Sequence, residues 1–552
     1  MKRVNKFFIY AAMFIGATTI NSCTKLDENI YDQLLTDNFY NNKNEVLSAV
    51  LRPYTHANAW STPSGQDGWW RLAELSADQL AWPTKGRHGE DGGKWKRLHY
   101  HSWTIDEGGI NQAWVLMWWG LGLCTSPIEN LESRTIESMG ITQVEKDAYI
   151  AELKLLRAFH YLKIQDLWGA IPIVTKIGEP LNPPTASRQE VFNFIEKEIL
   201  DNVNKAPKHS AAMVGRMSQA AAYAMLVELY LNAQATIGTP KWDECIAAAN
   251  KLISGEAGGQ NGAMALDANI NDTYSPNNDK VSKEAIFSIA YEFQAGNFQP
   301  SWPSEFYHFD QRNIYGGARN GNDGIVLIPG VWTKYQDEDL RKRGWFLEGT
   351  QYQFANPANP VLATGGNEYQ GQPLVFVDNI RKNKTGSTVS NMSEGEENSG
   401  VRFNKYKLGN QVAGPGGNPP INPKYNSTDW HVYRLSWIYF AKAEALMRKN
   451  NNVATGEAVT LVNDVKKRAF TPADWATRAY TVATLTMDEL LEERGREFIF
   501  EGFRRQDLIR FNKLTTGTWW DHVPSAEFRK LYPIPLRQQA LNPALVQNAG
   551  YQ

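Results

Sequence analysis

The sequence predicts a mainly α-helical protein, in which a scaffold of paired helices is interrupted by two loop-rich regions. Apolar residues recur at helical spacing through most of the chain, and Ser/Thr-x-x-Glu capping boxes stand where several of these segments begin. Gly and Trp gather in residues 58–110, and Gly, Asn and Pro in residues 256–430. Long insertions in a helical scaffold usually have a function, and the aromatic content of these two argues against disorder.

Each predicted helix has an apolar face or a boundary signal. Thr142, Ser187 and Thr486 are each followed by Glu at the third position, which is the capping-box pattern. Pro240 is well placed in the first turn of a helix. The predicted helices span residues 37–57, 111–133, 142–168, 187–204, 218–235, 240–253, 434–449, 457–469 and 486–511.

These helices form four pairs of tetratricopeptide-like (TPR-like) character. The pair at residues 218–253 is 36 residues long, close to the tetratricopeptide period of about 34, and its Ala-rich second helix permits close packing. The repeat signature is degenerate, so we expect an α-solenoid of TPR-like units with a shared core. The pairs span residues 37–133, 142–204, 218–253 and 431–469.

Four further local predictions concern the second half of the chain. The runs AIFSIAYEF and PLVFVD predict short strands, and NKTGSTVSNMSEGEENSG, residues 383–400, predicts a mobile loop. The helix at 486–511 carries i,i+4 pairs such as Glu492/Arg496, worth about 0.2–0.5 kcal/mol each, and its charged residues are predicted to form mostly a solvated face. Arg341 and Arg343, which follow the acids Asp337, Glu338 and Asp339, are predicted to serve structural ion pairs.

The N-terminus has the features of a lipoprotein signal. Residues 1–22 combine basic residues, a short apolar run and small residues, and the run is shorter than the roughly 20 residues of a membrane span. Ile20 to Cys23 resembles a bacterial lipobox, so we expect Cys23 to be lipidated and to anchor the chain. The alternative is an ordinary secreted protein with an incidental Cys23. No later segment is apolar enough to span a bilayer.

Charge and cysteine content exclude several classes of protein. Removing residues 1–22 takes away three basic residues and no acid, so the net charge falls from −2 to −5, and no Lys/Arg run suggests nucleic acid as a partner. Cys124 and Cys245 lie in apolar helical settings, where a disulfide between them is neither required nor excluded, and the chain is no disulfide scaffold. The unusual feature is the 19 Trp, of which nine lie in residues 60–119.

Four segments together carry a family resemblance. They are the lipobox start, ELSADQLAWPTKG with GGKWKRLHYHSWT in residues 74–104, ELLEERGREFIFEGFRRQDLIRF in residues 489–511, and YPIPLRQQALNPALVQNAGY in residues 532–551. With the helix pairs, they make the mature chain resemble the SusD/RagB family, the outer-membrane nutrient-uptake lipoproteins of Bacteroidetes. The last two segments are long and quite specific.

The resemblance implies a fold, an activity, a partner and a location. The fold is four TPR-like pairs with an irregular region that carries the ligand site. The activity is non-enzymatic binding of oligosaccharides, or of peptides in some members, with no cofactor and no metal. The partner is a SusC-like TonB-dependent outer-membrane transporter, over which the lipoprotein sits as a lid. The acids after Cys23, namely Asp27 and Glu28, resemble a surface-export signal and imply the outer face of the outer membrane.

The same interpretation divides the chain into regions. They are a signal peptide at residues 1–22, a lipid-anchored tether at 23–36, an N-terminal helical region at 37–255, a ligand-binding insertion at 256–430 and a C-terminal helical region at 431–552.

Sugar recognition needs flat aromatic rings flanked by polar side chains, and two loops have this composition. From WPTKGRHGEDGGKW, residues 82–95, we select Trp82, Arg87, Asp91 and Trp95. The alternative for both Trp is packing, because most Trp are highly buried. The second region spans residues 291–345, where the alternative is an aromatic mini-core under a long loop. Its candidates are Asn297, Trp302, Tyr307, Tyr315, Arg319, Asn320 and Trp332.

Other aromatic and histidine residues receive structural interpretations. Trp114, Trp118 and Trp119 are assigned to packing, because an aromatic stripe on a helix is usually core. His99 and His101 alternate on a predicted strand and would share a face, but two ligands do not make a metal site.

Two other classes of function stay open at this point. A helical glycoside hydrolase would need two carboxyl groups across a cleft, and Glu292, Glu305 and Asp310 lie in the aromatic region, although nothing marks one of them as a proton donor. A scaffold for protein contacts alone would leave the Trp-rich loops unexplained.

Overall fold

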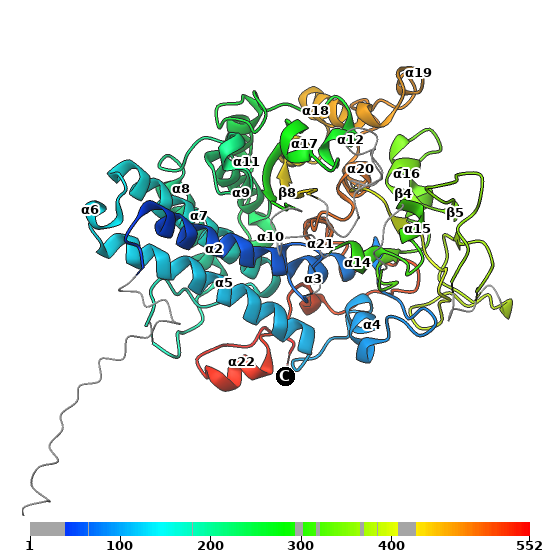
Figure 1. Ribbon diagram of the computed structural model, residues 1–552, viewed down its shortest axis with the longest axis horizontal. Helices are drawn as coiled ribbons and strands as arrows, with labels where there is room; N and C mark the ends of the chain where they lie inside the picture. The colour runs from blue at the N-terminus through cyan, green and yellow to red at the C-terminus, as the bar shows by residue number, and fades with distance from the viewer. Residues whose placement is uncertain are drawn as a thin grey trace, which may run out of the picture.

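The computed structural model describes residues 39–64, 66–178, 180–292, 302–315, 321–364, 369–382, 385–406 and 427–551. It confirms the predicted fold class, because helices dominate and the strands are short (Figure 1). The long helices lie at the left and top of Figure 1, and α16 (Leu340–Gly344) lies at the right with β4 (Phe346–Leu347) and β5 (Gly349–Thr350). The predicted lipidation site Cys23 and the candidates Asn297, Arg319 and Asn320 lie outside the described residues.

The four predicted helix pairs are present as packed neighbours. Successive pairs also touch, through α5 with α7, α8 with α9 and α11 with α17, so the stack is continuous although residues 254–434 separate its last two pairs in the sequence. The pairs are α2 (Lys43–Ser61) with α5 (Gly108–Ser133), α7 (Gln143–Trp168) with α8 (Arg188–Asn202), α9 (Gln219–Leu231) with α11 (Trp242–Ile253), and α17 (Leu435–Lys449) with α18 (Gly456–Lys466).

Local signals set the ends of several helices. Thr142 and Glu145 form a reciprocal capping box at the start of α7, and Ser187 and Glu190 form another at the start of α8, as the sequence predicts. Helix α7 ends at Gly169, whose φ of +75° suits glycine. These caps satisfy backbone N–H groups that have no partner inside the helix.

The strands form antiparallel pairs, and short helices connect them. The pairs found in the described residues are β1 (Leu80–Ala81) with β3 (Val326–Leu327), β2 (Ala285–Ile289) with β8 (Trp430–Arg434), β4 (Phe346–Leu347) with β7 (Arg402–Phe403), and β5 (Gly349–Thr350) with β6 (Val375–Phe376). The shorter helices are α3 (Trp69–Leu75), α4 (Lys94–His99), α6 (Ile136–Met139), α10 (Ala233–Ile237), α12 (Ile270–Thr273), α13 (Asn278–Val281), α14 (Pro303–Phe306), α15 (Arg312–Tyr315), α19 (Pro472–Trp475) and α22 (Leu536–Leu541).

The predicted helix at residues 486–511 is two helices. Helix α20 (Met487–Phe498) ends before a turn, and α21 (Arg504–Arg510) follows it. Phe500 and Gly502 have φ values of +73° and +86°, which no α-helix accommodates. The backbone C=O of Phe500 accepts a hydrogen bond from Trp70 Nε1 at 2.8 Å. A Cβ at Gly502 would lie 2.4 Å from the Trp69 ring, so the turn is fitted against α3.

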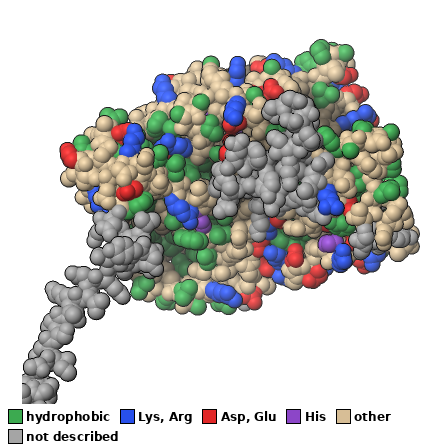
Figure 2. Space-filling model, in the orientation of Figure 1, with side chains coloured by type: hydrophobic (Ala, Val, Ile, Leu, Met, Phe, Trp, Pro, Cys, Tyr) green, Lys and Arg blue, Asp and Glu red, His purple; other side chains and the backbone are tan. Residues whose placement is uncertain are grey.

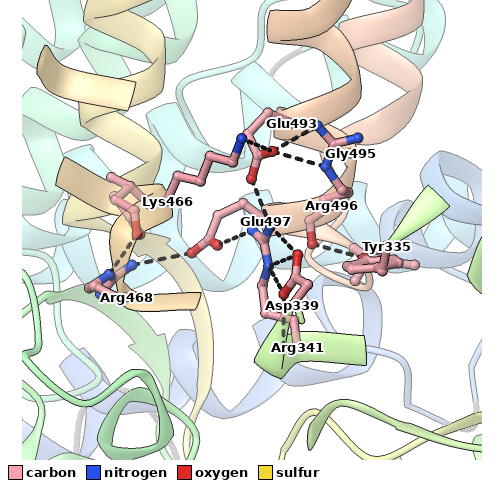
Figure 3. A network of polar contacts seen from close by, with 12 residues as sticks. Tyr335, Asp339, Arg341, Lys466, Arg468, Glu493, Gly495, Arg496 and Glu497 are labelled. Atoms are coloured by element: carbon pink, nitrogen blue, oxygen red, sulfur yellow. Dashed lines mark hydrogen bonds and ion pairs between the residues drawn. The ribbon is translucent and has the colours of Figure 1, made fainter. Parts of the chain in front are cut away.

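The charged residues of α20 and α21 are mostly buried, so the prediction of a solvated face is wrong. Figure 3 shows Arg341 at the centre of the network. Its guanidinium donates to Asp339, to Glu493 at 2.8 Å and to Glu497 at 2.9 Å, and all four side chains are at most 2% exposed. The predicted structural role is confirmed for Arg341, whereas Arg343 is exposed and forms no ion pair within the described residues. The contacts of Arg341 hold α16 against α20, and Arg496 adds an ion pair to Glu493 within α20 at 2.7 Å.

The outer surface differs from the sequence expectations at two places. Trp114 is buried and Trp118 half-buried, but Trp119 is 55% exposed, so its assignment to packing is wrong. Within the predicted mobile loop, residues 395–400 are buried.

Basic and acidic side chains are interspersed over the described part of the face in Figure 2. None of the helices described is both long and apolar enough to cross a membrane.

Candidate functional site

Trp82 and Trp95 form a stacked pair that closes the first candidate loop. Their ring centroids lie 4.4 Å apart with planes inclined by 3°, and the Arg71 guanidinium lies 5.3 and 5.4 Å from the two centroids. The two side chains are 6% and 2% exposed. A Cβ at Gly89 or at Gly324 would lie 2.9 Å from the Trp82 ring, so the backbone also packs closely on it. The expectation of exposed rings is wrong here, and the alternative of packing holds.

The polar residues of this loop lie on the outside of the stacked pair. Arg87, Glu90 and Asp91 are exposed. The Asp91 carboxylate accepts a hydrogen bond from Trp95 Nε1 at 2.5 Å, which fixes its position relative to the stack. Arg87 Nε lies 3.5 Å from His88 Nε2. Of the residues selected in this loop, Arg87 and Asp91 therefore present polar groups to solvent on a rigid frame.

The Lys85 side chain connects the first candidate loop to the chain just before strand β3. Its side chain is fully buried and donates from Nζ to the backbone C=O of Gly324 at 2.6 Å. Burial lowers the pKa of Lys85 to about 7, while the nearby charge of Asp323 raises this pKa and that of Arg402 lowers it. The charge of this amine is therefore linked to the folding of the loop.

Lys85 gives the protein a testable pH dependence. Because its pKa is lower in the folded chain than the ordinary 10.5, folding releases a proton, and this group's contribution to stability increases as pH rises from about 7 towards 10.5. We expect Lys85→Met to flatten that rise in the free energy of unfolding, measured by urea denaturation at several pH values. Lys96→Met, at a half-buried lysine of the neighbouring α4, is the control. An unchanged slope in Lys85→Met would contradict this linkage.

Two of the three acids considered for catalysis, Glu305 and Asp310, have buried structural positions, whereas Glu292 is exposed. Glu305 is 4% exposed and accepts from Arg71 at 2.7 Å, and Arg71 also donates to Asp67 at 3.0 Å. Asp310 is 1% exposed and accepts from the backbone N–H of Thr364 at 3.0 Å. These contacts hold the walls of the aromatic region together, and neither carboxyl group faces open solvent.

The aromatic candidates of the second region form a mini-core. Trp302, Tyr307 and Tyr315 are 0–1% exposed, so their expected role as exposed platforms is wrong and the packing alternative holds. Trp302 packs against aromatic rings of the C-terminal half, with the Trp430 centroid 5.6 Å away. The sequence signal of Pro or Gly beside each ring indicates a turn but does not say which way the ring points. Trp332 is half-buried, with Lys342 Nζ 4.3 Å from its ring centroid.

His99 and His101 do not share a strand. His99 ends helix α4, and His101 has a φ of +51° in the turn that follows. His99 Nε2 lies 2.7 Å from the Asp521 carboxylate, and His101 Nε2 lies 2.8 Å from the backbone C=O of Ser76. Burial of Trp95 and Leu98 at helical spacing overrides the alternation that the sequence indicated. No group of three potential metal ligands is found in the described ranges.

Residues 395–399, in the segment predicted to be a mobile loop, lie beside the first candidate loop and pair with it. The backbone N–H of Gly86 donates to Gly395 C=O at 2.9 Å, and the N–H of Gly395 donates to Thr84 C=O at 3.0 Å. The Glu397 carboxylate lies 3.6 Å from His88 Nε2. The segment GEENS thus belongs to the candidate site, and its run of acids beside glycines gave no signal of this pairing.

Comparison with known proteins supports the same assignment from sequence and from fold. Residues 330–526 match the model of the SusD family. The starch-binding protein SusD of Bacteroides thetaiotaomicron is 25% identical over 453 residues, which cover 75% of each chain. The SusD-like protein P38 of Formosa agariphila is 25% identical over 428 residues, covering 73% of this chain and 74% of that protein.

Solved structures share the fold over nearly the whole chain. A laminarin-binding SusD-like protein has a TM-score of 0.68 at 18% identity, covering 93% of this chain and 100% of that one. Surface glycan-binding protein A of Bacteroides thetaiotaomicron, in complex with laminarihexaose, has a TM-score of 0.68 at 18% identity, covering 92% and 99%. The match over residues 330–526, the relatives along three quarters of the chain and the shared fold together show that this chain is similar to proteins of the SusD family.

Proposed function

We propose that this protein binds glycan at the bacterial cell surface without catalysis, and passes it to a SusC-like TonB-dependent transporter. The observation that carries the proposal is its similarity to the starch-binding protein SusD, which extends over 75% of both chains. A solved neighbour of the same fold, a surface glycan-binding protein, holds laminarihexaose. Carbohydrate as the ligand class follows from these relatives, and import through a transporter follows from the family resemblance.

The arrangement of the candidate loop supports binding rather than chemistry. The Trp82–Trp95 stack and Lys85 hold a rigid frame, on which Arg87 and Asp91 can donate to and accept from sugar hydroxyls. Trp332 keeps part of its ring accessible. We therefore retain Arg87, Asp91 and Trp332 as proposed ligand contacts. The buried, paired positions of Glu305 and Asp310 disfavour the glycoside hydrolase alternative.

The cell-surface location rests on the N-terminal sequence. An acyl-modified Cys23 would supply a membrane anchor, and the acids that follow it resemble a surface-export signal. Radiolabelled palmitate incorporation in a Bacteroidetes host, lost in Cys23→Ala, would test the anchor. Protease accessibility of the chain on intact cells would test the exposed face.

Affinity electrophoresis of residues 24–552 tests the ligand class. We expect a neutral or acidic polysaccharide from a plant, microbial and host panel to retard the protein, and we expect Arg87→Ala to weaken the retardation without changing the melting temperature. Lys96→Ala is the matched control, because Lys96 is a basic residue of the neighbouring helix α4 that lies outside the loop. Retardation by casein or peptide mixtures with none by any glycan would replace the proposal by peptide capture. Release of reducing ends during incubation would contradict binding without catalysis.

A further inference from the structure

A cavity lies in the central insertion, beside the segment that pairs with the candidate loop. It encloses about 630 Å³, within the size of small-molecule sites. Its described walls come from residues 350–360, 369–377 and 396–398. Aromatic rings are contributed by Tyr352 and Tyr369, and polar groups by Gln372, Glu396 and Asn398.

Strand alternation builds one wall of this cavity. The backbone N–H of Gln351 donates to Leu374 C=O at 2.9 Å, and the N–H of Val361 donates to Gln351 C=O at 2.8 Å, so three short extended segments lie side by side. Val361 and Leu374 point into a small apolar cluster with Phe376. Residues one position away from these paired residues therefore point to the opposite side and line the cavity, namely Pro360, Pro373 and Val375, and Tyr352 next to Gln351. Tyr352 is 51% exposed there.

The other wall presents buried oxygen atoms. Glu396 and Asn398 are 2% and 4% exposed. The Arg402 guanidinium donates to the backbone C=O groups of Glu397 at 2.9 Å and Ser399 at 2.8 Å, which fixes the chain on both sides of Asn398. Within the described residues, Oδ1 of Asn398 is buried without a hydrogen-bond partner. A buried acceptor of this kind costs free energy that a ligand donor would recover.

We propose that this cavity binds a neutral sugar unit, with its ring face on Tyr352 and its hydroxyl groups donating to Asn398 and Glu396. Among the described residues, the lining holds one carboxyl group and no Lys or Arg, which disfavours uronate, sulfated and sialylated sugars. A flat ring beside fixed polar groups suits a hydroxyl-rich pyranose. This inference rests on the proposed function for the class of ligand, and it adds the place and the charge of the sugar.

The cavity and the candidate loop belong to one rigid unit. Glu396 and Asn398 follow directly on Gly395, whose backbone pairs with Thr84 and Gly86 of the loop. Glu397, between them in sequence, instead contacts His88. The cavity and the candidate loop are therefore joined by this segment of the backbone.

Calorimetric titration of residues 24–552 tests the proposal. The probes are neutral gluco-, xylo- and manno-oligosaccharides, with oligogalacturonate and sialyllactose as acidic probes. We expect a neutral oligosaccharide to bind, and Tyr352→Ala and Asn398→Leu each to weaken its affinity about tenfold or more. Phe354→Ala is the matched control, because Phe354 lies two residues from Tyr352, is 37% exposed and does not line the cavity. We expect it to bind within about twofold of the unmodified protein.

Each result decides between the two proposals. Unchanged affinity in both cavity variants would overturn the inference and leave the proposed function standing. Preference for the acidic probes would overturn the neutral-sugar assignment. If the unmodified protein binds no glycan here or in electrophoresis, the proposed function fails and this inference fails with it. Thermal melts accompany the titrations, and if Asn398→Leu does not fold, Tyr352→Ala and Asn398→Ser carry the test, since Tyr352 is half exposed.

Discussion

Replacement of Arg341 by Leu is expected to lower the free energy of unfolding by about 3–5 kcal/mol, because it breaks a buried ion network from its centre. The Arg341 guanidinium is 1% exposed and donates to Asp339, Glu493 and Glu497. Without it, three carboxyl groups lose a cationic partner in a site where water cannot replace it. The effect is larger than for a surface pair, whose median contribution is about 0–1 kcal/mol.

Urea denaturation followed by far-UV circular dichroism measures this loss. Arg343→Leu is the matched control, because Arg343 lies in the same helix α16, is exposed and carries the same charge. We expect that control to stay within about 0.5 kcal/mol of the unmodified protein. Equal losses in the two variants would show that net charge, and not the buried network, determines the effect.

The free energy of unfolding of these two variants should also depend differently on pH in the acid range. Burial raises the pKa of the Glu493 carboxyl, but the charges of Arg496, Arg341 and Lys466 lower it further, so its pKa lies well below the ordinary 4.5. The stability that Glu493 contributes is therefore present above about pH 4.5 and is lost as pH falls towards the folded-state pKa. We expect Arg341→Leu to show a smaller loss of stability below pH 4.5 than Arg343→Leu does.

The sequence predicts the helix pairs well because their signals are local. The capping boxes at Thr142 and Ser187 satisfy backbone groups within one turn, and the periodic apolar face of α11 determines which side of it packs. The turn at Phe500 and Gly502 has no comparable local cause. It depends on Trp69 and Trp70, which meet it only in the folded chain. The one available hint is Gly502 itself, since glycine is favoured beyond a helix end.

The candidate site is predicted less well because composition does not determine which way a ring points. The sequence identifies the loop at residues 82–95, but the burial of Trp82 and Trp95 arises from their contact with each other and with Arg71 of α3. The described lining of the proposed sugar cavity contains no Trp, so the aromatic signal used to select candidate loops did not identify it. Its polar wall at 396–398 lies in a segment whose glycines and acids are typical of mobile loops, yet Arg402 fixes it from β7.

Replacement of Trp82 by Ala is expected to cost about 3–5 kcal/mol and to release the loop at residues 83–93, because the ring fills the space between Trp95, Gly89 and Gly324. Glycan affinity should fall with it. That fall would arise from the lost frame under Arg87 and not from a lost contact between the ring and a sugar. Thermal melts, hydrogen exchange of the loop amides and calorimetric titration measure the three quantities on one sample.

A second variant separates the two causes. Gly324→Ala leaves the Trp82 ring in the chain, but its Cβ would lie 2.3 Å from the Glu305 backbone oxygen and 2.9 Å from the ring, so it should displace both that backbone and the stack and open the same loop. Arg87→Ala, in contrast, should lower affinity with the loop amides still protected, because Arg87 is exposed and holds no part of the core. If Trp82→Ala kept its melting temperature and its loop protection while losing affinity, the ring itself would contact the ligand. A joint loss of stability, amide protection and affinity in both Trp82→Ala and Gly324→Ala would instead assign a positioning role to the stacked pair. Removal and displacement of the ring would then have the same effect, as expected if the ring supports the loop and does not contact the ligand.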